Sequence, residues 1–123
     1  MTDRKVIFVA FPIEEEMARN HLKGQSLNTR SPFDYIDMSV KEPYDSGWKE
    51  KVRARIKRSH GVIAMISKHS TNSTGQKWEI QCAKDEGVPV IGIRIRSEDT
   101  TSMPGINTYV WTWANIAKFI DQL

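Results

Sequence analysis

The chain has 123 residues, of which 39% are hydrophobic and 27% charged, and 18 basic against 15 acidic residues give a net charge of +3. This length suits a single domain over residues 1–123, and the composition excludes a disordered tail and a membrane-spanning protein. One cysteine and three scattered histidines exclude a disulfide framework and predict no metal site. Without an apolar run of membrane-spanning length or a signal-peptide pattern, we expect a cytoplasmic domain.

The first third of the chain predicts a strand, a helix and a second strand. The apolar run Val6–Ala10 is typical of a strand buried on both faces. A proline followed by the acids Glu14–Glu16 predicts a helix start. Apolar residues at helical spacing predict the inner face of that helix (Ile13, Met17 and His21 or Leu22). The run Phe33–Met38 predicts a strand whose two aspartates suit a sheet edge.

The same alternation continues through the rest of the chain. Residues 48–58 fit both a strand and a helix period, and their wealth of helix formers favours a helix. The elements predicted after it are strands at Val62–Ile66, Val88–Ile95 and Tyr109–Trp111, with a helix at Thr74–Glu86. A last helix, capped by Thr112, is expected to turn five residues inward (Trp113, Ile116, Ala117, Ile120 and Leu123).

This order of elements predicts an α/β fold in which helices cover both faces of a mostly parallel sheet. The expected sheet has five strands in the order 2-1-3-4-5, with the polar second strand at an edge. Ligands of such sheets bind outside the carboxyl ends of the strands. Four segments lie at those ends in this sequence (Ala10–Phe11, Asp37–Ser39, Ser67 and Arg94–Arg96).

The stretch Lys49–Arg58 carries six basic residues and one acid. A basic helix can neutralise phosphates, but basic helices are more often solvated faces that keep a protein in solution. No aromatic residues are interleaved with these charges, and no known nucleic-acid module is present. We therefore expect no nucleic-acid partner.

The segment Ser67–Ile80 carries the chemistry that the predicted fold would use. A hydroxyl-rich loop leads from a strand end into a helix whose second turn holds Glu79. A carboxylate there can hold a ribose hydroxyl or stabilise an oxocarbenium-like centre, although a helical glutamate is more often a solvated surface residue. Trp78 is likewise more often a packing residue than a ligand platform. No phosphate-binding glycine motif or phospho-accepting aspartate is present, so phosphoryl transfer is not expected.

Several of these motifs together resemble the TIR-like domains of bacterial Thoeris defence systems. The motifs are the strand Val6–Phe11, the strand Val62–Ser67, the run Trp78-Glu79-Ile80 and the run from Pro89 to Ile93. The resemblance extends over roughly residues 4–121 and implies a flavodoxin-like three-layer fold. One departure is Gly75, which stands where many enzymatic members carry a tryptophan.

The resemblance also implies an activity and a set of site residues. Many enzymatic TIR domains cleave NAD at the nicotinamide–ribose bond and then hydrolyse, cyclise or transfer the ADP-ribosyl part as a signal. Glu79 matches their catalytic glutamate, and NAD is then a substrate, with no cofactor or metal needed. The resemblance further implies a substrate-binding set (Phe11, Asp37, Ser39, Trp48, Ser67 and Trp78).

Two other functions remain open on the sequence. A TIR-like domain can act without catalysis, by assembling with itself or with a second defence protein. A nucleoside deoxyribosyltransferase-like enzyme also places a glutamate beside a glycosidic bond.

Overall fold

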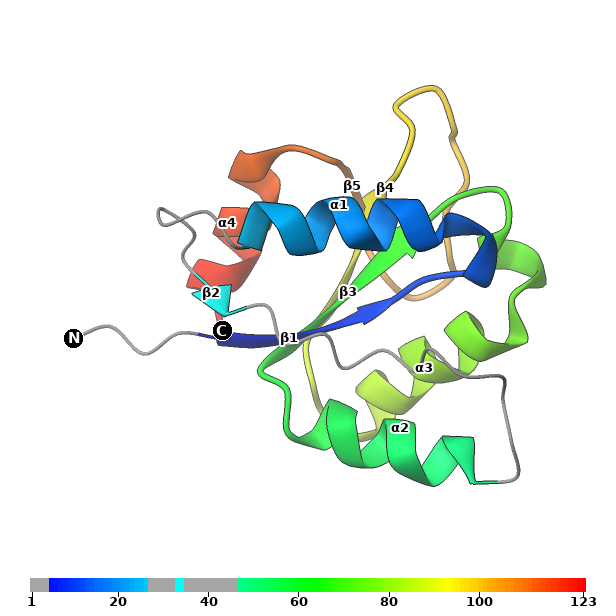
Figure 1. The fold of residues 1–123 in the computed structure, drawn as a ribbon, viewed down its shortest axis with the longest axis vertical. Helices are drawn as coiled ribbons and strands as arrows, with labels where there is room; N and C mark the ends of the chain where they lie inside the picture. The colour runs from blue at the N-terminus through cyan, green and yellow to red at the C-terminus, as the bar shows by residue number, and fades with distance from the viewer. Residues whose placement is uncertain (1–4, 27–32, 35–46) are drawn as a thin grey trace.

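The computed structural model describes residues 5–26, 33–34 and 47–123, and strands and helices alternate along them. Figure 1 shows their arrangement. The elements are β1 (Lys5–Ala10), the 3₁₀ turn η1 (Ile13–Glu15), α1 (Glu16–Ser26), β2 (Phe33–Asp34), α2 (Trp48–Lys57), β3 (Gly61–Ile66), the 3₁₀ turn η2 (Ser70–Asn72), α3 (Thr74–Asp85), β4 (Val90–Arg94), β5 (Thr108–Val110) and α4 (Trp113–Asp121).

The predicted α/β class and the parallel sheet are confirmed. Strands β1, β3, β4 and β5 lie side by side and run parallel. The two-residue β2 pairs with the start of β1, which gives the order β2-β1-β3-β4-β5. The predicted strand Phe33–Met38 is described only at its first two residues, because residues 35–38 lie outside the described part of the chain.

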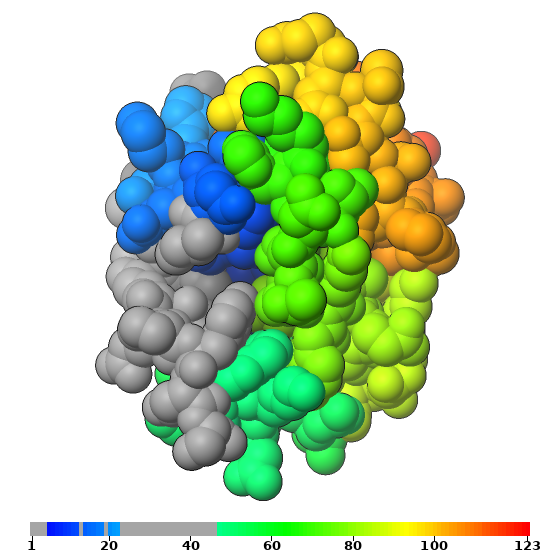
Figure 2. Space-filling model, turned by 90° about the vertical axis from the view of Figure 1, so that its right-hand side faces the viewer, coloured from blue at the N-terminus to red at the C-terminus, as the bar shows by residue number. Residues whose placement is uncertain are grey.

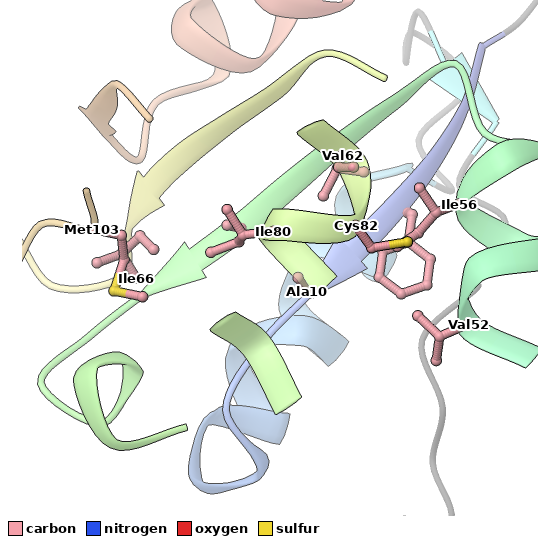
Figure 3. Packing of buried hydrophobic residues seen from close by; sticks show 11 residues of the cluster. Ala10, Val52, Ile56, Val62, Ile66, Ile80, Cys82 and Met103 are labelled. Carbon is pink, nitrogen blue, oxygen red and sulfur yellow. The ribbon is translucent and has the colours of Figure 1, made fainter. Parts of the chain in front are cut away.

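Helices cover both faces of the sheet. On one face, residues of α1 and α4 pack on β1, β3 and β4 (Ile7, Val9, Phe11, Leu22, Ile63, Met65, Ile93, Ile116, Phe119 and Ile120). On the other face, α2 and α3 pack on the same strands. Figure 3 shows part of this second cluster, with Cys82 of α3 beside Ile56 of α2 and Met103 beside Ile66 of β3. Strands buried on both faces need the continuous apolar runs that the sequence shows.

The helix at residues 48–58, for which the sequence fitted two periods, is confirmed as α2. Its Val52 and Ile56 are fully buried while most of the basic residues point outward. The same α2 face packs on α3 and β1. Only one narrow apolar stripe of α2 is buried, and the rest of the helix faces solvent. With so few apolar positions, the sequence fitted both the strand period and the helix period.

Two expected inner-face residues are exposed. Met17 is 86% exposed because the turn η1, which has about three residues per turn, breaks the helical phase before α1 begins. Of the expected alternatives His21 and Leu22, Leu22 faces the core, and Ala18 packs against the same cluster. Trp113 is 39% exposed because it is the first residue of α4, directly after the capping residue Thr112.

The connection at residues 95–107 contains no helix or strand, but some of its side chains pack against the core. Met103 and Ile106 from this connection complete the cluster beneath α3. Among the residues that the structure describes, no helix is both long and apolar enough to cross a membrane.

Candidate functional site

The segments that follow β1, β3 and β4 meet at one edge of the sheet. Figure 2 looks onto this edge, with the blue segment after β1, the green segment after β3 and the yellow segment after β4. Parallel strands end on the same side, so their following loops necessarily gather there. This edge is where the sequence predicted a ligand to bind.

The start of α3 is fixed on this edge by its side chains. The Ser73 hydroxyl caps the helix by accepting a hydrogen bond from the Gln76 backbone N–H at 3.1 Å. The Gln76 side chain is fully buried, and its amide nitrogen donates to the carbonyl oxygens of Ala10 at 3.1 Å and Met65 at 2.8 Å. One amide therefore holds α3 across the ends of both β1 and β3.

Sequence reasoning missed Gln76. Its signal was present, because a polar residue stands where Ile80 and Ala83 set an apolar helical spacing. A polar side chain on a buried face needs hydrogen-bond partners, and the carbonyls at strand ends supply them. The amide oxygen of Gln76 is buried without a partner among the described residues.

Glu79 lies one turn after Gln76 and is only 4% exposed, which excludes the solvated surface position that helical glutamates usually take. Within the described residues its carboxyl group has no hydrogen-bond or ion-pair partner. Burial without a partner disfavours the charged form and raises the pKa of Glu79 to about 8. A carboxyl group in this setting is a candidate for catalysis rather than for stability.

The other residues of the predicted substrate-binding set have different surroundings. Phe11 is 8% exposed and packs in the cluster beneath α1 and α4, so little of its ring is open to a ligand. Ser67 is fully buried, and its hydroxyl accepts a hydrogen bond from the His69 N–H at 3.1 Å. Asp37 and Ser39 lie outside the described residues.

Trp48 and Trp78 form a pair between α2 and α3. Their rings meet edge to face, with centroids 5.1 Å apart and planes at 68°. Two cations from α2 lie over the Trp78 ring, with the Lys49 ammonium 6.0 Å and the Arg53 guanidinium 5.4 Å from its centroid. Arg53 also forms an ion pair with Glu86 at 3.0 Å. The two indoles are half-buried, so the pair serves packing and still presents some ring surface.

A charged network that the sequence analysis did not anticipate ties the loops of this edge together. Glu15 is 4% exposed and accepts two hydrogen bonds from the Arg96 guanidinium, at 2.7 and 3.0 Å. Arg96 is the main cause that holds the pKa of Glu15 below its usual value, and a hydrogen bond from Ser67 adds to it. The Lys68 N–H donates to Asp99 at 2.8 Å. These contacts join the segments after β1, β3 and β4.

An open groove of about 530 Å³ lies on the α1 side of the sheet. Its lining comes from α1, η1 and the ends of β4 and β5 (Glu15, Met17, Ala18, His21, Ile95, Arg96 and Trp111). Glu79 does not line it. Among the described residues, no cluster of three or more potential metal ligands exists.

Comparison with known families agrees with the sequence motifs. The model of the family described as Thoeris protein ThsB, TIR-like domain, matches residues 8–100, about three quarters of the chain. The chain belongs to this family. The matched segment begins in β1 and includes α3 with Glu79. Membership confirms the resemblance and implies a role in bacterial antiphage defence. No curated protein matches the chain.

Proposed function

We propose that this chain cleaves NAD at the nicotinamide–ribose bond, with Glu79 as the catalytic carboxyl group, to make a signal in antiphage defence. The observation that carries the proposal is a carboxyl group, 4% exposed and without a partner among the described residues, on the helix that Gln76 fixes to the ends of β1 and β3. We also propose that residues 1–123 form a single TIR-like domain of the flavodoxin-like class.

The chemistry needs little besides orientation and negative charge. When the bond between the ribose anomeric carbon and the pyridinium nitrogen breaks, the electron pair goes to nicotinamide, which leaves neutral. Positive charge then develops on the ribosyl group. A carboxylate in a poorly hydrated position interacts strongly with that charge. Water or another nucleophile completes the reaction by bonding to the anomeric carbon and losing a proton.

The protonation state of Glu79 fits a cationic substrate. In the free protein, burial favours the neutral acid, with a pKa of about 8. A pyridinium ring beside the carboxyl group favours its ionised form. Substrate binding would therefore create the carboxylate at the place where the reaction needs it, and would release one proton per bound NAD at neutral pH.

The indoles Trp48 and Trp78 are the ring-binding groups in this proposal. They retain exposed surface, and Lys49 and Arg53 beside them can meet a pyrophosphate. The buried Phe11 ring contributes packing behind the strand end. Asp37, Ser39 and Ser67 remain in the proposed substrate-binding set on the strength of the family resemblance.

Non-enzymatic assembly has separate support. Three large apolar side chains are exposed on the edge strand β5 and at the start of α4 (Tyr109 42%, Val110 44% and Trp113 39%). An exposed strand edge with apolar side chains is a place where another chain can pair. Light scattering at rising protein concentration tests self-association, and Val110→Lys should prevent it.

The enzymatic proposal is tested by incubating the pure protein with NAD and separating the products by chromatography. Release of nicotinamide with consumption of NAD supports it, and the partner product shows whether the ADP-ribosyl part is hydrolysed, cyclised or transferred. A parallel incubation with deoxynucleosides and free bases tests the deoxyribosyltransferase alternative. Intact NAD at every protein concentration, including those at which the chain self-associates, would favour the assembly role.

A further inference from the structure

We propose that Gln76 is the positioning residue for Glu79: its amide nitrogen is fixed on the ends of β1 and β3, and its amide oxygen receives the proton of the Glu79 carboxylic acid. The inference rests on the proposed function only in treating Glu79 as the catalytic group. The hydrogen bond itself can exist whether or not the protein cleaves NAD.

The orientation of the Gln76 amide follows from its two acceptors. Both hydrogens of the amide nitrogen are used, on the carbonyl oxygens of Ala10 and Met65. A carbonyl oxygen cannot donate to the other end of the amide, so the group has only one orientation that satisfies these contacts. The amide oxygen is then left as a buried acceptor that has no partner among the described residues.

Among the buried side chains of α3, Glu79 is the nearest to Gln76 along the helix that can supply a donor. Residues three apart on a helix are neighbours, with Cβ atoms about 5–6 Å apart, which lies within reach of a carboxyl group and an amide. Both side chains are on the buried side of α3. A buried acceptor without a donor destabilises the fold, and so does a buried acid without an acceptor. One hydrogen bond between them removes both penalties.

None of the described charged groups around α3 is paired with Glu79. On α2, Arg53 pairs with Glu86, and Lys49 lies over the Trp78 ring. On β4, the Arg94 side chain has its Nε buried without a described partner, and Cys82 follows Glu79 by one turn of α3. The described parts of β1 and β3 that face α3 are apolar (Phe8, Ala10, Val62, Ala64 and Ile66). Although the Arg94 Nε has no described partner, burial is the only cause that shifts the pKa of Glu79, so no described cation keeps Glu79 ionised before a ligand arrives.

The pairing gives Glu79 two states with different hydrogen bonds. As a neutral acid it donates to the Gln76 oxygen and is held against the strand ends. As a carboxylate it faces an acceptor that repels it, because neither oxygen has a hydrogen to share. A cationic ligand would provide the interaction that the ionised form then lacks. Gln76 thus favours the neutral acid until a cation binds.

The experiment is an NMR titration of the wild-type protein with ¹³C,¹⁵N-labelled glutamine and glutamate, without NAD, between pH 6 and pH 9.5. We expect the Gln76 side-chain amide signals to move with the same midpoint as the Glu79 carboxyl carbon. Gln81 is the internal control, because it is exposed on the same helix and donates a hydrogen bond to Asp85. Its side-chain amide signals should not move with that midpoint. Gln76 signals that stay still while Glu79 titrates would overturn the proposal.

A variant gives an independent test. In Gln76→Met the acceptor is lost, so the pKa of Glu79 should fall by roughly one unit, since a hydrogen bond to the neutral form is removed. A role confined to packing predicts the opposite, because a methionine makes the surroundings more apolar and an unchanged or higher pKa follows. Gln81→Met is the matched control. If Gln76→Met does not fold, the wild-type titration decides alone, and neither measurement depends on NAD turnover.

Discussion

Arg96 donates two hydrogen bonds to Glu15, at 2.7 and 3.0 Å, and so joins the turn after β1 to the end of β4. Glu15 is almost completely buried while Arg96 is half-exposed. The guanidinium favours the charged form of this nearly buried carboxylate and lowers its pKa. The contact therefore links two of the loops at the carboxyl ends of the strands, and it makes the stability of the protein depend on pH.

Arg96→Gln should lower the free energy of unfolding by about 1–3 kcal/mol at neutral pH, because a buried carboxylate loses its partner. The lowered pKa of Glu15 contributes stability above its unfolded value near 4.5, and this contribution is lost as the pH falls through the folded pKa. The difference between variant and wild type should therefore shrink below about pH 4. Urea unfolding at pH 7 and pH 3.5 measures it, with the exposed Arg58→Gln as control. Equal losses at both pH values would contradict the assignment.

The sequence predicted the fold more completely than the site. The apolar runs at β1, β3 and β4 could be recognised because strands buried on both faces have no polar alternation. The inner faces of α1 and α4 were partly wrong at Met17 and Trp113, because a 3₁₀ turn and a capping residue shift the helical phase in ways that spacing does not show.

Glu79 was identified through the family resemblance, since a helical glutamate by itself is most simply a surface residue. Gln76 and the pair of Glu15 with Arg96 were not identified. Their roles depend on contacts between segments 66 and 81 residues apart, which no local pattern records. Polar residues that interrupt an apolar helical face are the signal that would have found Gln76.

Burial of Glu79 changes what its replacement does to stability. Helix propensities alone predict no effect for Glu79→Gln. However, the folded protein holds a proton up to about pH 8 that the unfolded chain loses near 4.5. The stability of the wild type is therefore complete below pH 4.5 and falls as the pH rises toward 8. The Gln variant has no such titration.

We therefore expect Glu79→Gln to become more stable than wild type as the pH rises, by roughly 3–5 kcal/mol at pH 8.5. Thermal unfolding of both proteins between pH 4 and pH 8.5 measures this difference. The exposed Glu50→Gln on α2 is the control and should follow the wild type. A constant difference across this range would mean that Glu79 is not protonated in the folded state.

Gly92→Ala should destabilise the sheet, because a Cβ atom at this position in β4 would lie 2.8 Å from the Thr108 hydroxyl and 3.0 Å from Ile66 Cγ1. Extra volume in a packed layer typically costs about 1–3 kcal/mol. Chemical denaturation measures the loss. Gly87→Ala provides a contrast: no atom lies within 4 Å of its Cβ position, and its φ of +71° makes the cost one of backbone strain.

Cys82 should be unreactive in the folded protein. It is 2% exposed between α2 and α3, and burial raises the pKa of its thiol. Since the thiolate is the reacting species, an aromatic disulfide reagent should modify the native chain at least about a hundredfold more slowly than the urea-unfolded chain. Rapid modification under native conditions would show that α3 separates from α2 readily.

The rate of NAD cleavage by Glu79→Gln, compared with wild type at pH 8, tests the central claim most directly. Glutamine keeps the shape of the side chain and removes only its ability to carry negative charge. We predict that nicotinamide release falls at least about a hundredfold, equivalent to roughly 2.7 kcal/mol of transition-state stabilisation, while Glu50→Gln keeps the wild-type rate. Cleavage by Glu79→Gln at the wild-type rate would contradict the claim that Glu79 is the catalytic group.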